Sequence, residues 1–178
     1  MLAATFPEYI QSLILLDSFG LITAEDQQTT QQLRHAMLSR QKLRPQRRLG
    51  YPDLFAAARA RQQQSDFDFA SALLLAERGT IQRDQSWYWT VDLRLRLTSA
   101  YRWNIQQARQ LISDVKAPVL AVLATDGLPL ISQARLTFED AYQQLQLIEM
   151  AGGHHLQLTQ PEAVAQAIRP FLTEHQRR

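Results

Sequence analysis

Two polar residues that could share one catalytic task each follow an apolar segment in the last third of the chain. Asp126 follows the segment at residues 117–124 after one threonine, and His154 follows the segment at residues 145–150 after one alanine and two glycines. A carboxylate that orients a histidine, which then acts as a general base, is two-thirds of a nucleophilic triad. Either residue alone is more often a turn or loop residue, but the pair on successive segments favours catalysis.

The elements that must position these residues are alternating strands and helices. Leu13–Leu16 and residues 117–124 are near-continuous apolar runs, typical of strands buried on both faces of a parallel sheet, and residues 145–150 are predicted as a third strand. Helices are predicted at about 131–142 and 161–174, the second with proline in its first turn. This alternation predicts an α/β fold with a parallel sheet. Loops at the carboxyl ends of such strands line the ligand crevice, which places Asp126 and His154 there.

A mostly helical block separates the first strand from the second. Helices are predicted at about 24–44, 53–63, 68–78 and 105–115, with short extended structure or a packed loop at 87–95. Thr23 is the expected N-cap of the first of these helices, and Gly79 is expected to end the third. We therefore divide the chain into residues 1–21, a helix end and a core strand; 22–104, a helical insertion; and 105–178, the carboxy-terminal α/β core.

The composition excludes several classes of protein. The 178 residues hold 19 Lys and Arg against 17 Asp and Glu, a formal net charge of +2, which is too small to indicate a general polyanion binder. Without cysteine there is no disulfide, thiolate metal site or cysteine nucleophile. The apolar runs are too short to cross a membrane, and we expect no secretory leader, because the first residues lack a basic region ahead of an apolar stretch. We expect a cytoplasmic protein that needs no metal and no other cofactor.

Three sets of residues resemble the carboxy-terminal part of an α/β-hydrolase. They are residues 3–17; residues 117–127; and residues 152–164, GGHHLQLTQPEAV, the most specific of the three. The closest likeness is to the serine hydrolase-like branch, related to esterases, epoxide hydrolases and haloalkane dehalogenases. The resemblance covers the whole chain and implies a partial α/β-hydrolase fold, with residues 22–102 as the cap or lid.

The resemblance also assigns residues to roles. Asp126 matches the catalytic acid and His154 the catalytic histidine. Asp17 is the reserve acid, because some relatives carry the acid one strand earlier, although a turn residue at a strand end is the commoner interpretation. His155, the neighbour of His154, is more simply a loop or packing residue.

The departure from the family concerns the nucleophile. No Gly-x-Ser-x-Gly occurs in the sequence, so the resemblance places the nucleophile elbow and the oxyanion hole upstream of Met1. We expect a truncated chain, inactive alone, whose intact form hydrolyses an ester or related bond in a small molecule with a serine or aspartate nucleophile. The missing amino-terminal half is then its natural partner.

Two alternatives to a hydrolase stay open. The first is a non-catalytic protein that oligomerises through its open sheet edge. The second, a nucleic-acid binder, would use the basic run Arg40–Arg48, but such a run is more often a solvated helix end, and we expect no nucleic-acid or membrane partner. The aromatic residues could line an acyl pocket or pack in a core: Trp87, Tyr88, Trp89, Tyr101 and Trp103.

Overall fold

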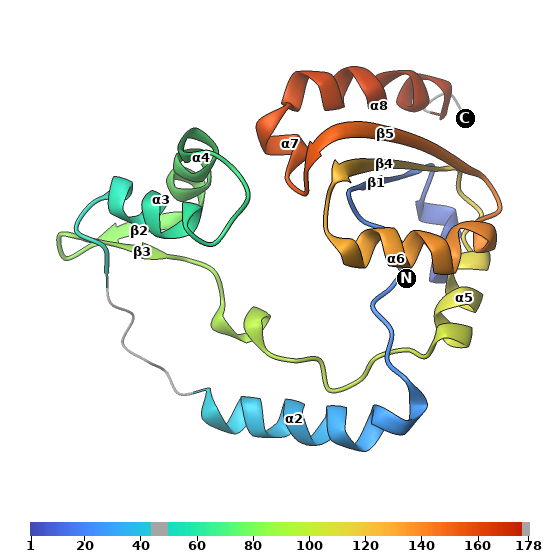
Figure 1. Ribbon diagram of the computed structural model, residues 1–178, viewed down its shortest axis with the longest axis horizontal. Helices are drawn as coiled ribbons and strands as arrows, with labels where there is room; N and C mark the ends of the chain where they lie inside the picture. The colour runs from blue at the N-terminus through green and yellow to red at the C-terminus, as the bar shows by residue number, and fades with distance from the viewer. Residues whose placement is uncertain (44–49, 176–178) are drawn as a thin grey trace. The chain divides into compact units, whose positions relative to one another are not determined.

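The computed structural model describes residues 1–43 and 50–175 (Figure 1). The chain forms two compact units. The first unit combines Met1–Glu25 with Trp103–Arg178, and the second is Asp26–Arg102. A parallel sheet with helices forms the first unit, and helices with a β-hairpin form the second. None of the described helices is long and apolar enough to cross a membrane.

The sheet of the first unit has the order β1-β4-β5, with all three strands parallel. Its strands are β1 (Leu13–Leu16), β4 (Val119–Asp126) and β5 (Leu145–Gly153). The predicted α/β fold is thereby confirmed. The first five residues of the central strand β4 are buried, as expected. Burial of β1 on both faces was a wrong prediction: all four of its residues are half-buried, because β4 is its only strand partner in the described residues.

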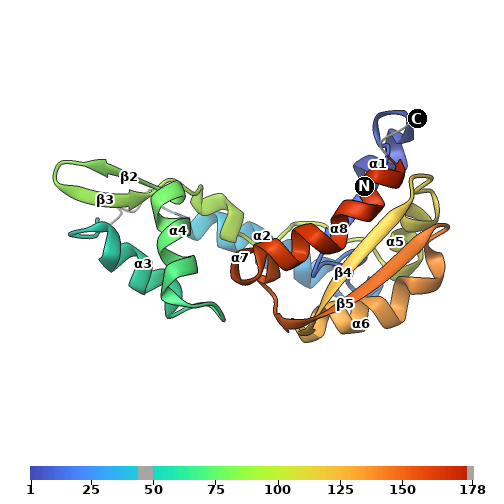
Figure 2. The same cartoon turned by 90° about the horizontal axis from the view of Figure 1, so that it is seen from above.

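Helices cover both faces of this sheet (Figures 1 and 2). They are α1 (Leu2–Thr5), α5 (Ile105–Ser113), α6 (Pro129–Phe138), α7 (Leu156–Thr159) and α8 (Pro161–His175), with short 3-10 turns at Pro7–Tyr9 and Glu139–Ala141. Alternate residues of β4 point to opposite faces. Leu123 packs with Phe138 of α6 in one cluster, whereas Leu120 packs with Phe171 of α8 in the other.

The second unit contains three helices and an antiparallel hairpin. Its elements are α2 (Thr29–Lys42), α3 (Leu54–Gln62), α4 (Phe69–Gly79), β2 (Thr80–Arg83) and β3 (Ser86–Trp89), with 3-10 turns at Asp26–Gln28 and Leu93–Arg96. The side chains of Asp53 and Asp68 cap α3 and α4 by accepting hydrogen bonds from backbone N–H groups, as aspartate does at helix N-termini. Asp84 and Gln85 both have positive φ in the turn of the hairpin, as a tight hairpin turn requires.

Several local predictions differ from the structure. Thr23 does not cap the first helix, because a 3-10 turn precedes α2 and Gln28 is its N-cap. The strand β2 and the short helix α7 were not predicted. Residue 44, the predicted end of the first helix, and part of the basic run Arg40–Arg48 lie outside the described residues.

Candidate functional site

The structure brings Asp17 and His154 together at one edge of the sheet. Asp17 directly follows β1, and His154 directly follows β5. The two strands flank β4 and are parallel, so their carboxyl ends meet at the same edge. Nδ1 of His154 lies 2.6 Å from Oδ2 of Asp17, a distance typical of a strong, charge-assisted hydrogen bond.

The backbone of β4 holds the carboxylate of Asp17. Its side chain is almost completely buried, with 1% exposure, so its oxygens need hydrogen-bond donors. The N–H of Ala124 donates to Oδ1 at 3.0 Å, and His154 engages Oδ2. The N–H of Asp17 in turn donates to the carbonyl of Val122 at 2.7 Å. The φ angle of Asp17 is +35°, a strained value for a residue with a side chain and one that clusters at functional sites.

Gly127 leaves room for this carboxylate. A Cβ atom at position 127 would lie 2.6 Å from Oδ1 and 2.7 Å from Oδ2 of Asp17. Both distances are shorter than van der Waals contact allows, so any side chain here would displace the carboxylate. Sequence reasoning missed this role, because an Asp-Gly pair after a strand is also an ordinary turn signal.

The loop that carries His154 is fixed by side chains from two neighbouring segments. The N–H of Gly152 donates to Oγ1 of Thr125 at 3.4 Å, and Nε2 of Gln160 donates to the carbonyl of Ala151 at 2.7 Å. The φ angle of Gly152 is +135°, and a Cβ there would lie 2.6 Å from Nε2 of Gln160. A glycine is therefore required at this position. The His154 side chain is 31% exposed, so its ring is open to solvent on part of its surface.

The other two predicted residues, Asp126 and His155, do not take part in this hydrogen bond. Asp126 is exposed at the end of β4, and its carboxylate accepts a hydrogen bond from Oγ1 of Thr125 at 3.3 Å. The pairing of β4 with β5 is irregular between Ala124 and Asp126. The geometry thus favours Asp17, the reserve acid, over Asp126 as the partner of His154. The ring of His155 lies beside that of His154, with 4.8 Å between centroids.

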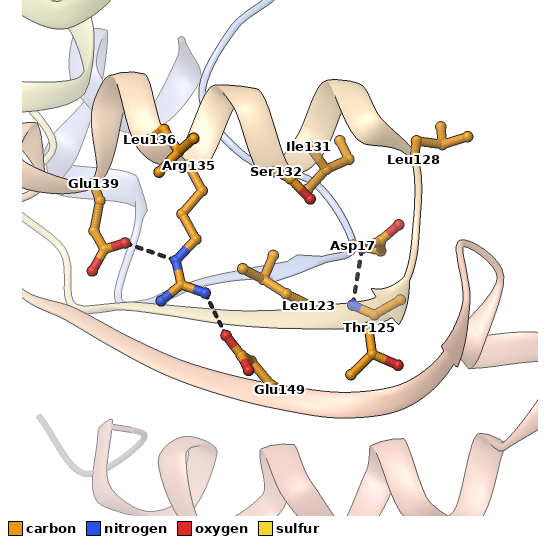
Figure 3. Close-up of a pocket in the computed structure, with 11 residues that line it drawn as sticks. Asp17, Leu123, Thr125, Leu128, Ile131, Ser132, Arg135, Leu136, Glu139 and Glu149 are labelled. Carbon is orange, nitrogen blue, oxygen red and sulfur yellow. Dashed lines mark hydrogen bonds and ion pairs between the residues drawn. The ribbon is translucent and has the colours of Figure 1, made fainter.

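A cavity of about 470 Å³ begins at Asp17 and runs between α6 and the sheet (Figure 3). Leu128 and Ile131 contribute apolar surface to it. Arg135 also lines the cavity and forms ion pairs with Glu139, at 2.7 Å, and with Glu149 of β5. Hydrogen bonds to these two carboxylates raise the pKa of Arg135 above its usual value. The ion pair with Glu149 ties α6 to β5.

The described parts of the chain contain no group of three or more His, Cys, Asp or Glu side chains that could hold a metal ion. The Asp17–His154 pair is instead the arrangement that orients an imidazole for proton transfer.

Comparison with known proteins identifies the fold. No family model matches the sequence. In structure, the chain is similar to a thioesterase domain from the curacin biosynthetic pathway, with a TM-score of 0.68 and 22% identity over 94% of the chain and 60% of that domain. It is also similar to a hypothetical protein of Pseudomonas aeruginosa PAO1, with a TM-score of 0.85 and 31% identity over 99% of the chain and 62% of that protein. The fold is that of the α/β-hydrolases.

Sequence comparison finds a similar protein that is described as serine hydrolase-like. The chain is 29% identical to a serine hydrolase-like protein of Danio rerio over 188 aligned positions, which cover 97% of the chain and 56% of the relative. The resemblance to the serine hydrolase-like branch of the α/β-hydrolases is thus confirmed. The chain spans little more than half the length of this relative.

Proposed function

We propose that this chain supplies the acid and the histidine of a hydrolase that cleaves an ester or related bond. The supporting observation is the 2.6 Å hydrogen bond between His154 and the buried Asp17 at the carboxyl edge of a parallel sheet. Asp17 holds the imidazole with Nδ1 toward the carboxylate, which leaves Nε2 as the nitrogen that exchanges a proton with the nucleophile. Asp17 takes the role of the acid, and Asp126 becomes a turn residue.

The nucleophile in this proposal comes from outside the 178 residues, since no Gly-x-Ser-x-Gly occurs among them. The isolated chain is then inactive, because an activated histidine without a nucleophile and an oxyanion hole performs no acyl transfer. Residues 26–102 act as the cap that shapes specificity, and the protein works in the cytoplasm on a small-molecule substrate.

The first test is to read the coding DNA in frame upstream of Met1. We expect it to encode a Gly-x-Ser-x-Gly segment; an aspartate at its centre would shift the chemistry toward epoxide or haloalkane hydrolysis. The 178-residue chain itself should not react with a fluorophosphonate probe, which labels activated serines. Labelling of this chain would contradict the external nucleophile.

The second test assigns the acid in the extended polypeptide, with p-nitrophenyl butyrate as substrate. His154→Ala should lower turnover by about 10⁶-fold, and Asp17→Asn by about 10⁴-fold. Asp126→Asn, the matched control, should stay within a few-fold of the parent. A large loss in Asp126→Asn with little loss in Asp17→Asn would return the role of the acid to Asp126.

A second candidate, self-association, is favoured by the edge of β1 that pairs with no strand in residues 1–43 or 50–175. A cavity of about 300 Å³ lies beside this edge and is lined by apolar side chains that include Leu2, Ile10 and Leu13. An in-frame stop codon directly upstream of Met1 would favour this candidate. Self-association predicts a defined dimer in light scattering. Leu2→Lys should weaken this dimer, since Leu2 is 60% exposed and lines the cavity. His154→Ala should leave the dimer intact.

A further inference from the structure

The positive charge of the chain is concentrated in its second unit. Residues 26–102 contain 13 Lys and Arg but only 7 Asp and Glu, whereas the rest of the chain contains 6 and 10. The formal charges of the two parts are therefore +6 and −4, which the total of +2 conceals. A concentrated charge of one sign raises the local concentration of ligands of the opposite sign.

This unit contains a cavity of about 400 Å³, within the size range of small-molecule sites. Its lining combines two aromatic rings, two guanidinium groups, two apolar side chains and an amide: Tyr51, Trp89, Arg61, Arg96, Ala60, Val91 and Gln64. None of the lining residues is acidic. All of them lie between positions 51 and 96, so the cavity belongs to the second unit alone.

The backbone holds the two aromatic residues in place. Tyr51 and Trp87 exchange two backbone hydrogen bonds of 2.8 Å, which attach Tyr51 to the β-hairpin. Trp89 ends β3 and pairs with Thr80 of β2. Its ring packs against Gly79, where a Cβ would lie 2.8 Å from Cζ3. The aromatic part of the lining is thus held in place before any ligand arrives, which reduces the entropy lost on binding.

The two arginines differ from others in the same unit. The guanidinium of Arg61 lies over the ring of Phe67, 5.6 Å from its centroid, which fixes a half-buried side chain without neutralising its charge. Arg96 is exposed at the end of a 3-10 turn. Neither forms an ion pair with a carboxylate in residues 1–43 or 50–175. Arg94, by contrast, is neutralised by Asp92 at 2.6 Å.

We propose that this cavity binds a small organic anion with an apolar body. The guanidinium groups of Arg61 and Arg96 bind its head group, a carboxylate or a phosphate monoester, because their planar N–H groups match both. Tyr51, Trp89 and Val91 contact its apolar body. The proposal does not depend on Asp17 or His154, which lie in the other unit.

Titration calorimetry on the full chain tests the proposal with three probes. 4-Phenylbutyrate carries a carboxylate, phenyl phosphate a phosphate monoester, and 4-phenylbutyramide the same apolar body as the first without the charge. We expect at least one anion to bind about tenfold or more tightly than the amide, as charged hydrogen bonds of ordinary strength imply. The tighter anion identifies the head group. Equal binding of amide and anions, or no binding of either anion, overturns the proposal.

Matched arginine variants locate the site. Arg61→Gln and Arg96→Gln should each weaken the binding of the tighter anion by about tenfold or more. Arg59→Gln and Arg83→Gln are the controls and should leave the affinity for this anion unchanged, since neither residue lines the cavity. Arg96→Gln removes an exposed side chain and should fold even if Arg61→Gln does not. The indole N–H signal of Trp89 should move on titration in ¹H–¹⁵N spectra. Unchanged affinity in Arg96→Gln, or signal shifts confined to residues outside the cavity, contradicts the assignment.

Discussion

The two units of the chain use different side chains to fill their interiors. In the first unit the buried residues include large aliphatic and aromatic side chains on both sheet faces, such as Leu120, Phe138 and Phe171. In the second unit Phe67 is the one large buried apolar residue among those described, and the others are alanines: Ala36, Ala57, Ala58, Ala72 and Ala76. A sheet covered by helices needs large side chains to fill the layer between them, whereas alanines let α3 and α4 approach closely.

The two units also hold their functional groups in different ways. The first unit holds Asp17 by burial and by the backbone of β4, so that its position depends on the core. The second unit presents guanidinium groups and aromatic rings at a cavity on its surface. The buried sheet edge of the first unit therefore suits proton transfer, which needs fixed geometry. The basic second unit suits the recognition of an anion.

The largest effect on stability is expected from the core of the first unit. Leu120→Ala should lower the free energy of unfolding by about 2–5 kcal/mol, because the side chain is fully buried and its loss leaves a cavity. The same substitution at Leu74 of α4, which is 50% exposed, is the control and should cost much less. Denaturant titration measures both, and hydrogen exchange should show that α3 and α4 keep their protection in Leu120→Ala. Equal loss of protection in the two units would remove the distinction between their cores.

Two glycine variants compare the functional groups of the units directly. Gly127→Ala places a methyl group against the carboxylate of Asp17 and should cost about 1–3 kcal/mol of stability, as overpacking does. It should also abolish the downfield ¹H signal of the His154 Nδ1 proton, which depends on the bond to Asp17.

Gly79→Ala is the matched variant of the second unit, since its methyl group would press on the ring of Trp89. Gly79→Ala should weaken the binding of the anion probe and leave the ¹H signal of the His154 Nδ1 proton intact. A His154 signal that survives in Gly127→Ala would contradict the role of Gly127 as the residue that positions Asp17.

Elements with strong local signals were predictable from the sequence. The near-continuous apolar run of β4, the aspartate caps of α3 and α4, and Pro161 at the start of α8 each act within a few residues. The strand β2 has no such signal, because its residues are mostly polar and its structure depends on pairing with the aromatic strand β3.

The hydrogen-bond partner of His154 could not be identified from the sequence. Asp17 and Asp126 both follow an apolar segment at the carboxyl edge of the sheet. What distinguishes Asp17 is a hydrogen bond from Ala124, 107 positions along the chain, and the space left by Gly127. Such long-range contacts follow from the register of β1 with β4, which composition and periodicity do not specify.

A helix cap makes the stability of the second unit sensitive to acid. The backbone N–H of Ser71 donates to Asp68 and holds the pKa of this carboxyl below its ordinary value of 3.8. The folded state thus favours the ionised form, so the stabilisation is present above the unfolded pKa and is lost as the pH falls through the lower, folded value. The protection factors of the α4 amides, which are corrected for the slower intrinsic exchange in acid, should fall below about pH 4. Asp68→Asn should reduce this acid dependence, while Glu77→Gln, elsewhere on α4, should keep it.

The smallest effect is expected at alkaline pH, in the first unit. Burial raises the pKa of Tyr142 above its ordinary value of 10.0, although a hydrogen bond from the N–H of Gly20 opposes the shift. The folded state therefore retains the phenolic proton after the unfolded chain has lost it, and stability falls as the pH rises from about 10 toward the folded pKa.

Tyr142→Phe should remove this alkaline loss and cost about 0.5–1.5 kcal/mol at neutral pH, where the N–H of Gly20 loses its acceptor. Tyr101→Phe, at an exposed position of the second unit, is the control and should leave the alkaline profile unchanged. Denaturant titrations between pH 8 and 11 compare the three proteins. A parallel alkaline decline in Tyr142→Phe and the parent would show that another group controls it, and the two units would then not differ in their response to base.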